Sequence, residues 1–212
     1  ASINKWLPAL RVESRTQNNY RAAVVQLFNY AQKTMKALPH WLPHAAEEAI
    51  KVQEPAKDTE IYGPEEMQKI LKAASPQLAP LIALRAFSGI RNEETWGLDW
   101  GEIDLERNVI KLKSSVTKLS QRRVMPLLPN LKAWLLQVSH REGRVAAGYK
   151  SAKTLSEAIT NVIIGAGVAP KRNALRNSYT SYRLAVHAEV GKVAEETGNS
   201  PAVIKSEYLE LV

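Results

Sequence analysis

The sequence contains no cysteine, which excludes disulfides, thiolate metal sites and cysteine nucleophiles. It also lacks long apolar runs, and none approaches the roughly 20 residues that a helix needs to cross a bilayer. The N-terminus lacks the basic start, apolar stretch and small-residue cleavage site of a signal peptide. We therefore expect a cytoplasmic protein with no membrane partner.

Most catalytic signatures are missing as well. Residues 165–167, Gly-Ala-Gly, lack the third glycine and the Lys-Ser/Thr of phosphate-binding loops, and no G-x-S-x-G elbow occurs. His40 and His44 are four residues apart, but the proline between them disfavours a helical metal pair, and surface histidines are the preferred interpretation. The sequence predicts neither a metal nor a cofactor.

The net charge of +8 is distributed unevenly along the chain. Residues 107–153 contain eleven lysines and arginines against one acid, whereas residues 58–106 contain ten acids against four bases. A concentrated basic stretch attracts polyanions, with an affinity that falls steeply with salt. From charge alone, a polyanion-binding surface and a solvated basic face without a partner are equally acceptable interpretations.

The N-terminal quarter predicts one helix followed by a linker. Residues 15–38 have apolar side chains at spacings of three and four, which predicts an amphipathic helix capped by Thr16 and ended by two prolines. The polar stretch 53–64 ends in Gly-Pro and is typical of a linker. We place the domain boundary there, which gives domains 1–57 and 58–212.

Most of the second domain predicts helices. Pro64 and the two acids after it form a helix start, residues 78–90 predict a buried helix closing near Gly89, and a short helix follows from Asn92. Further helices are expected over residues 130–139, 152–164, 171–187, 189–197 and 200–209.

Two β-rich runs interrupt this helical pattern. Residues 109–113 and 122–127 flank a polar stretch, and together they predict a hairpin. The expected fold is therefore mainly α with a small antiparallel β-sheet (α+β).

Four ordered motifs resemble those of the tyrosine recombinases, the phage-integrase family. Residues 87–105, FSGIRNEETWGLDWGEIDL, are similar to the first conserved box, which implies that Arg91 is the first catalytic arginine and Glu94 its supporting carboxylate. In VTKLSQRRVMPL, Lys118 lies eight residues before a proline, the position of the family's β-hairpin lysine.

The remaining two motifs lie near the C-terminus. NALRNSYTSYRLA is similar to the second box and implies that Arg176 is the second catalytic arginine. TGNSPAVIKSEYLELV resembles the closing segment and implies that Tyr208 is the nucleophile. Asn199 lies 23 residues after Arg176 and nine before Tyr208, and the family uses both spacings. The four matches extend over residues 88–208.

The resemblance implies an integrase-type catalytic domain after a truncated helical domain that helps to clamp DNA. Such a protein cuts and rejoins double-stranded DNA through a 3′-phosphotyrosyl intermediate during integration or recombination of mobile elements, as a homo-oligomer on the DNA. Two arginine forks suit the charge that grows on the phosphate oxygens, and Lys118 can protonate the departing 5′-oxygen. The DNA contacts that we predict come from Lys111, Lys113, Arg122, Arg123, Lys171 and Arg172.

The sequence departs from the family pattern where Asn173 and Asn199 replace the usual histidines. Asparagine can hydrogen-bond to phosphate but cannot exchange a proton near neutral pH, so we expect reduced activity. Asn177 also replaces a common histidine, and we interpret this change as minor. A relative that binds DNA without catalysis and an unrelated helical structural protein are the alternatives.

The ends of the chain depart from the pattern too. The N-terminal part, about 55 residues, is shorter than the usual clamp domain, and four residues follow Tyr208 where relatives often have a longer docking tail. We expect either a trimmed chain or a naturally reduced form.

Overall fold

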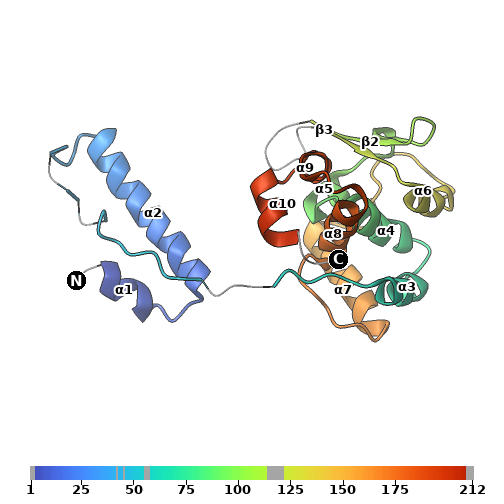
Figure 1. Ribbon diagram of the computed structural model, residues 1–212, viewed down its shortest axis with the longest axis horizontal. Coiled ribbons are helices and arrows are strands. Elements are labelled where there is room, and N and C mark those ends of the chain that lie inside the picture. The colour runs from blue at the N-terminus through green and yellow to red at the C-terminus, as the bar shows by residue number, and fades with distance from the viewer. Residues whose placement is uncertain (1–2, 42, 45, 55–57, 114–121, 209–212) are drawn as a thin grey trace. The chain divides into compact units, whose positions relative to one another are not determined.

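The computed structural model describes residues 3–41, 43–44, 46–54, 58–113 and 122–208. The chain forms two compact units, Ala1–Lys57 and Asp58–Val212, which Figure 1 shows from blue to red along the sequence.

The first unit contains two helices, α1 (Ile3–Ala9) and α2 (Ser14–Lys33). Residues 48–52 are held against them by two asparagines that each donate and accept. Asn4 bonds the Glu48 carbonyl and the Ile50 amide, and Asn18 bonds both backbone groups of Val52, all at 2.9 Å. Side-chain amides thus satisfy backbone groups of a segment that forms neither helix nor strand.

Helix α2 confirms the predicted helix in type but not in its ends. It begins two residues before Thr16, so the predicted cap is wrong, and it ends at Lys33, before the prolines that were expected to stop it. Several of its apolar side chains are exposed, among them Tyr20 at 46% and Leu27 at 64%. The sequence analysis missed α1, a seven-residue helix with Pro8 inside it.

The second unit contains the expected helices with small shifts at their ends. They are α3 (Pro64–Ala73), α4 (Ala79–Ser88), α5 (Asn92–Gly97), α6 (Pro129–Leu136), α7 (Ala152–Gly165), α8 (Ala174–His187), α9 (Val190–Thr197) and α10 (Pro201–Tyr208). Helix α8 begins three residues later than predicted because Asn173 has φ 56°, a left-handed conformation that a helix cannot include.

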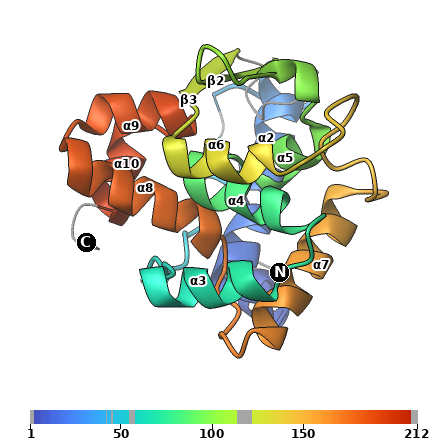
Figure 2. The same ribbon diagram turned by 90° about the vertical axis from the view of Figure 1, so that its right-hand side faces the viewer.

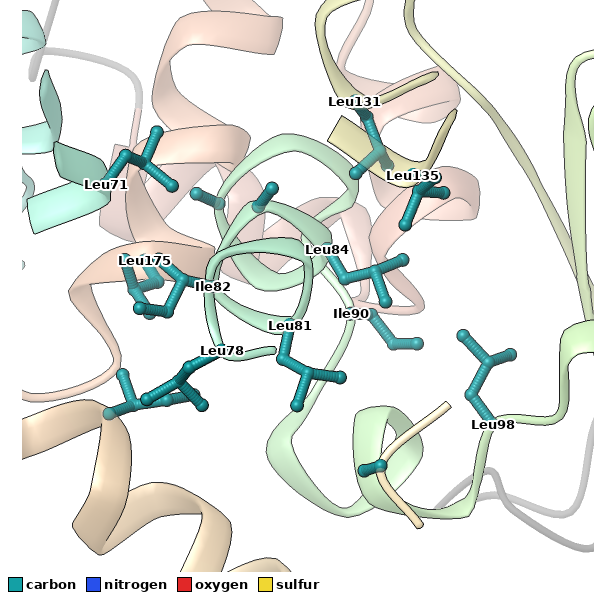
Figure 3. Packing of buried hydrophobic residues seen from close by; sticks show 14 of the residues in the cluster. Leu71, Leu78, Leu81, Ile82, Leu84, Ile90, Leu98, Leu131, Leu135 and Leu175 are labelled. Atoms are coloured by element: carbon teal, nitrogen blue, oxygen red, sulfur yellow. The ribbon is translucent and has the colours of Figure 1, made fainter. Parts of the chain in front are cut away.

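Helix α4 lies at the centre of this unit and packs against α3, α5, α6 and α8. Figure 3 shows the leucines of α6 facing Leu84 of α4, with Leu98 and Ile90 nearby. Leu84, Ile90, Leu131 and Leu135 have no exposed surface. The continuous apolar stretch therefore forms a helix that is buried all round, as its sequence predicts.

A three-stranded antiparallel sheet, in the order β1-β2-β3, lies at one edge of the unit. Strands β2 (Val109–Leu112) and β3 (Arg123–Pro126) confirm the two runs of the hairpin, and Ile110 is paired with Met125. The short strand β1 (Ile103–Asp104), which follows the 3-10 turn Trp100–Glu102, was not predicted. Residues 114–121, which include the expected hairpin turn and Lys118, lie outside the described residues.

Helices α8, α9 and α10 pack on one another and form one side of the unit, as Figure 2 shows. Strand β3 contacts α9, and α8 contacts α4. The motif residues predicted from distant parts of the sequence are therefore carried by neighbouring elements.

Candidate active site

Arg91 lies at the sharp turn between α4 and α5. Gly89 ends α4 with φ 64°, and a side chain there would overlap with the ring of Tyr179, so only glycine fits. Glu94, three residues after Arg91, accepts from the Arg91 backbone amide and from its Nη1, both at 2.9 Å. The carboxylate thus caps α5 and fixes the guanidinium at once.

Arg176 lies in the first turn of α8 and is buried, with 9% of its surface exposed. Its Nη1 donates to the Gly89 carbonyl, and its Nη2 donates to the Thr197 carbonyl at 2.6 Å. Burial, together with the positive charges of Arg91 and Arg123, lowers the pKa of Arg176 to about 9. Arg176 therefore remains a cation at neutral pH, held by backbone carbonyls rather than by a carboxylate.

The two predicted catalytic arginines meet at Asn199. Its Oδ1 accepts from Arg176 Nη2 at 2.9 Å and from Arg91 Nη2 at 3.3 Å, and Arg91 Nη2 also donates to the Gly198 carbonyl at 2.7 Å. One neutral oxygen therefore lies between two guanidinium groups. Positions this close to two cations favour an anionic oxygen electrostatically.

Tyr208 is the last described residue of α10 and is 8% exposed. Its hydroxyl donates to Asn177 Oδ1 at 3.0 Å, and Asn177 directly follows Arg176. Burial raises the pKa of Tyr208, and the nearby Arg176 opposes this shift. The Asn177 Nδ2 donates to the carbonyls of Glu60 and Arg172, at 3.2 and 3.3 Å, which fixes the amide so that its oxygen faces the tyrosine.

The segment Thr59–Tyr62 runs along the helices that carry these residues. Thr59 Oγ1 donates to Glu207 Oε2 of α10 at 3.0 Å. The Tyr62 amide donates to Ser178 Oγ of α8 at 2.7 Å, and the Tyr62 hydroxyl donates to the Ala169 carbonyl at 3.3 Å. The start of the second unit is therefore bonded to both α8 and α10.

Of the other predicted site residues, one lies apart from this arrangement and one lies outside the described residues. Asn173 is exposed at the start of α8, and no described hydrogen bond joins its side chain to Arg91, Arg176 or Tyr208. Lys118 cannot be placed, since it lies outside the described residues.

The six basic residues predicted to contact DNA fall into distinct environments. Arg122 and Arg172 are exposed. Lys111 and Lys113 are exposed beside Asp104 and Glu102, at 3.6 and 4.0 Å. Lys171 Nζ lies 2.7 Å from Glu66 Oε1 and 4.9 Å from the centre of the Tyr62 ring. Arg123 differs from all of these, because its side chain is 9% exposed and points inward to Glu94 at 2.6 Å.

Arg123 and Asn177 were not predicted to lie among the catalytic residues. Arg123 had a usable signal, since Met125 and Leu127 are apolar at alternate positions and place Arg123 on the same inner face of the strand. Asn177 also had a signal, since it replaces a common histidine next to Arg176, but the change was interpreted as minor because its contact with Tyr208 depends on how α8 and α10 cross.

Among the described residues, no group of three or more His, Cys, Asp or Glu side chains is placed to hold a metal ion. None of the described helices combines the length and the apolar character that a membrane crossing requires.

No protein-family model and no curated protein sequence matches the chain. Solved structures do match. The Tn1549 transposon integrase in complex with transposon right end DNA is 13% identical, with a TM-score of 0.79 over 99% of this chain and 80% of that one. The XerH site-specific recombinase in its difH pre-cleavage complex is 21% identical, with a TM-score of 0.68 over 98% and 67%.

The integrase from mycobacterium phage Brujita is 19% identical, with a TM-score of 0.60 over 96% of this chain and 72% of that one. These identities are low, but each match extends over almost the whole chain. The mainly helical arrangement with a small antiparallel sheet is thus shared with these solved recombinases and integrases. The chain has the fold of the tyrosine recombinases.

Proposed function

We propose that the chain is a tyrosine recombinase that cuts and rejoins double-stranded DNA through a 3′-phosphotyrosyl intermediate. The observation that carries this proposal is the shared acceptor Asn199 Oδ1, which brings the guanidinium groups of Arg91 and Arg176 to one point. Tyr208 is bonded to the residue next to Arg176. The similar structures support DNA as the partner, since the Tn1549 integrase and XerH were solved with DNA.

In the proposed reaction, a non-bridging phosphate oxygen replaces Asn199 Oδ1 as the acceptor for both arginines. The Tyr208 oxygen then forms a bond to phosphorus while the bond from phosphorus to the 5′-oxygen breaks. The tyrosine loses its proton, and the departing 5′-oxygen gains one, for which we propose Lys118. The ester that forms keeps the energy of the broken bond, so the reverse step rejoins a strand without a nucleotide cofactor.

The proton of Tyr208 has no basic side chain in the usual family position. Asn173 and Asn199 replace the histidines there, and neither can take a proton near neutral pH. Loss of general-base catalysis lowers a rate by about 10²–10⁴-fold. We therefore propose slow cleavage, with the proton passing to water.

A nicked suicide substrate tests the proposal, because the broken strand diffuses away and leaves DNA attached to the protein. The parent should form a covalent adduct on a cognate site, and Tyr208→Phe should form none. Tyr182→Phe, which changes a tyrosine of α8, serves as the matched control and should behave as the parent. If Tyr208→Phe still forms the adduct, or if no cognate site yields any adduct with the parent, the catalytic proposal is wrong.

A second candidate function is DNA binding without catalysis. It is favoured by Asn199, whose side-chain oxygen already satisfies both arginines and so competes with a phosphate. Restoring the family residues distinguishes the two: Asn199→His and Asn173→His should raise the rate of adduct formation if the rest of the site is intact. DNA binding that stays tight while both variants form no adduct would favour the second candidate.

We further propose that residues 58–212 are the catalytic domain and that residues 1–57 are part of a clamp domain that assembles with further copies on DNA. Arg122 and Arg172 are exposed and suit direct phosphate contacts. Binding should weaken steeply with salt, because each neutralised phosphate releases counterions. Cytoplasmic mobile-element integration is the setting that we propose for this activity.

A further inference from the structure

Arg123 lies at the start of β3, and its side chain is only 9% exposed, although the sequence predicts a DNA contact there. Its Nη2 lies 2.6 Å from Glu94 Oε2, and its Nη1 donates to the Thr197 carbonyl at 2.9 Å. Both acceptors are shared with the proposed catalytic arginines. Glu94 also accepts from Arg91, and the Thr197 carbonyl also accepts from Arg176.

Through these shared acceptors, Arg123 connects Glu94, which holds Arg91, to the Thr197 carbonyl, which holds Arg176. Burial alone would raise the pKa of Glu94, but Arg123 and Arg91 outweigh it and lower that pKa, so the carboxylate stays ionised. A carboxylate with one guanidinium on each side cannot move toward Arg91 without leaving Arg123. The Thr197 carbonyl is held between Arg123 and Arg176 in the same way.

Gly198 provides an independent sign that the space around Arg123 is tightly defined. It ends α9 with φ 65°, and a Cβ there would overlap with Arg123 Nη1 and lie 3.3 Å from Arg91 Nη1. The backbone at the end of α9 therefore lies so close to both guanidinium groups that residue 198 has no room for a side chain. This close approach also lets the Gly198 carbonyl accept from Arg91.

We propose that Arg123 is a positioning residue that sets Arg91 through Glu94 and Arg176 through the Thr197 carbonyl, so that both forks meet one phosphate. This rests on the proposed function, because it assigns the two arginines to a phosphate. Arg123 itself does not touch the phosphate. Small displacements of an anion-binding group lower a reaction rate by up to about 10²-fold. Removing the Arg123 guanidinium should therefore lower the rate of adduct formation.

The test compares two suicide substrates, one with the normal scissile phosphate and one with a neutral methylphosphonate. Arg123→Gln should slow adduct formation on the phosphate by about 10²-fold and on the methylphosphonate by much less, since there is less charge to stabilise. Arg123→Lys, which keeps the charge but not the fork, should lose activity in the same pattern to a smaller extent. Arg107→Gln, which changes an exposed arginine of the same basic stretch with no assigned contact to DNA, is the control and should not change the ratio of the two rates.

A purely structural role for Arg123 would slow both substrates equally, and that result would overturn the proposal, as would unchanged rates. The unfolding midpoint of each variant identifies loss of folding. Gly198→Ala, whose added methyl group would displace the Arg123 guanidinium, should reproduce the substrate pattern in a protein that still contains Arg123.

If the parent itself forms no adduct, the catalytic function fails, and inorganic phosphate then decides the role of Arg123. The parent should unfold at higher denaturant with phosphate present, and Arg123→Gln should lose this shift while Arg91 and Arg176 remain. An equal shift in both proteins, or none in the parent, would refute the positioning role.

Discussion

Arg176 and Arg85 are both buried arginines on helices that pack together, yet their surroundings are opposite. Arg176 donates to two backbone carbonyls and to Asn199. Arg85, on α4, is 8% exposed, and the described residues offer it no hydrogen bond or ion pair. Burial lowers the pKa of Arg85 to about 10. Burying a cation that has no acceptor costs free energy of folding. The acceptors around Arg176 offset that cost and fix the orientation of its guanidinium group.

The same substitution at both positions should therefore give opposite results, and the largest effect is expected at Arg176. Arg176→Met should lower the rate of adduct formation by about 10²–10³-fold, because a fixed donor to the phosphate oxygens is lost. It should also lower the free energy of unfolding by about 1–3 kcal/mol, because two carbonyls lose a donor. Suicide-substrate kinetics and urea unfolding measure the two effects.

Arg107→Met is the control for the Arg176 experiment, since Arg107 is 79% exposed. It should leave both quantities nearly unchanged. Normal adduct formation by Arg176→Met would remove Arg176 from the proposed mechanism.

Arg85→Met should instead raise the free energy of unfolding by about 1–3 kcal/mol, since it replaces a buried charge with an apolar side chain of similar volume. The cost of Arg85 is fully present at neutral pH, where both the folded and the unfolded states are protonated, and it disappears only as the pH rises above about 10. Thermal unfolding should move upward by about 2–4 °C per kcal/mol. A lower midpoint would mean that Arg85 has a stabilising partner.

The smallest effect on stability is expected at an exposed cation. Lys113 is 68% exposed and 4.0 Å from Glu102, so Lys113→Met should change the free energy of unfolding by less than about 0.5 kcal/mol. If Lys113 contacts a phosphate, the slope of log binding constant against log salt should fall by about 0.9. Lys153→Met, 85% exposed, is the matched control in the same basic stretch, and equal slopes for both variants would remove Lys113 from the DNA contacts.

The helices of the second unit could be predicted from the sequence because apolar periodicity and end signals agree there. Pro64 with two acids, the apolar stretch of α4 and Gly89 each have one local interpretation, and each was confirmed. The convergence of Arg91 and Arg176 was predicted only through the resemblance to a family. The opposite charge environments of Arg176 and Arg85 could not be predicted, since they depend on carbonyls supplied by α9 and by the end of α4.

The inward orientation of Arg123 could not be predicted for a related reason. The basic character of residues 107–153 suggests a solvent-facing charge, and composition does not say which cations of the stretch point inward. In the first unit the opposite occurred, as apolar periodicity on α2 predicts a covered face and the side chains of Tyr20 and Leu27 are exposed. In both regions the spacing of apolar residues predicts which side chains share one face of the strand or helix. Whether that face is buried depends on the neighbouring elements.

The segment Thr59–Tyr62 connects the start of the second unit to the helix that ends in Tyr208. Its hydrogen bonds include those with Glu207 of α10 and with Asn177 and Ser178 of α8. The segment therefore bridges α8 and α10 from outside both helices. Asn177 is the residue that bonds both to the segment, through the Glu60 carbonyl, and to the Tyr208 hydroxyl, so a single side chain connects the start of the second unit to that group.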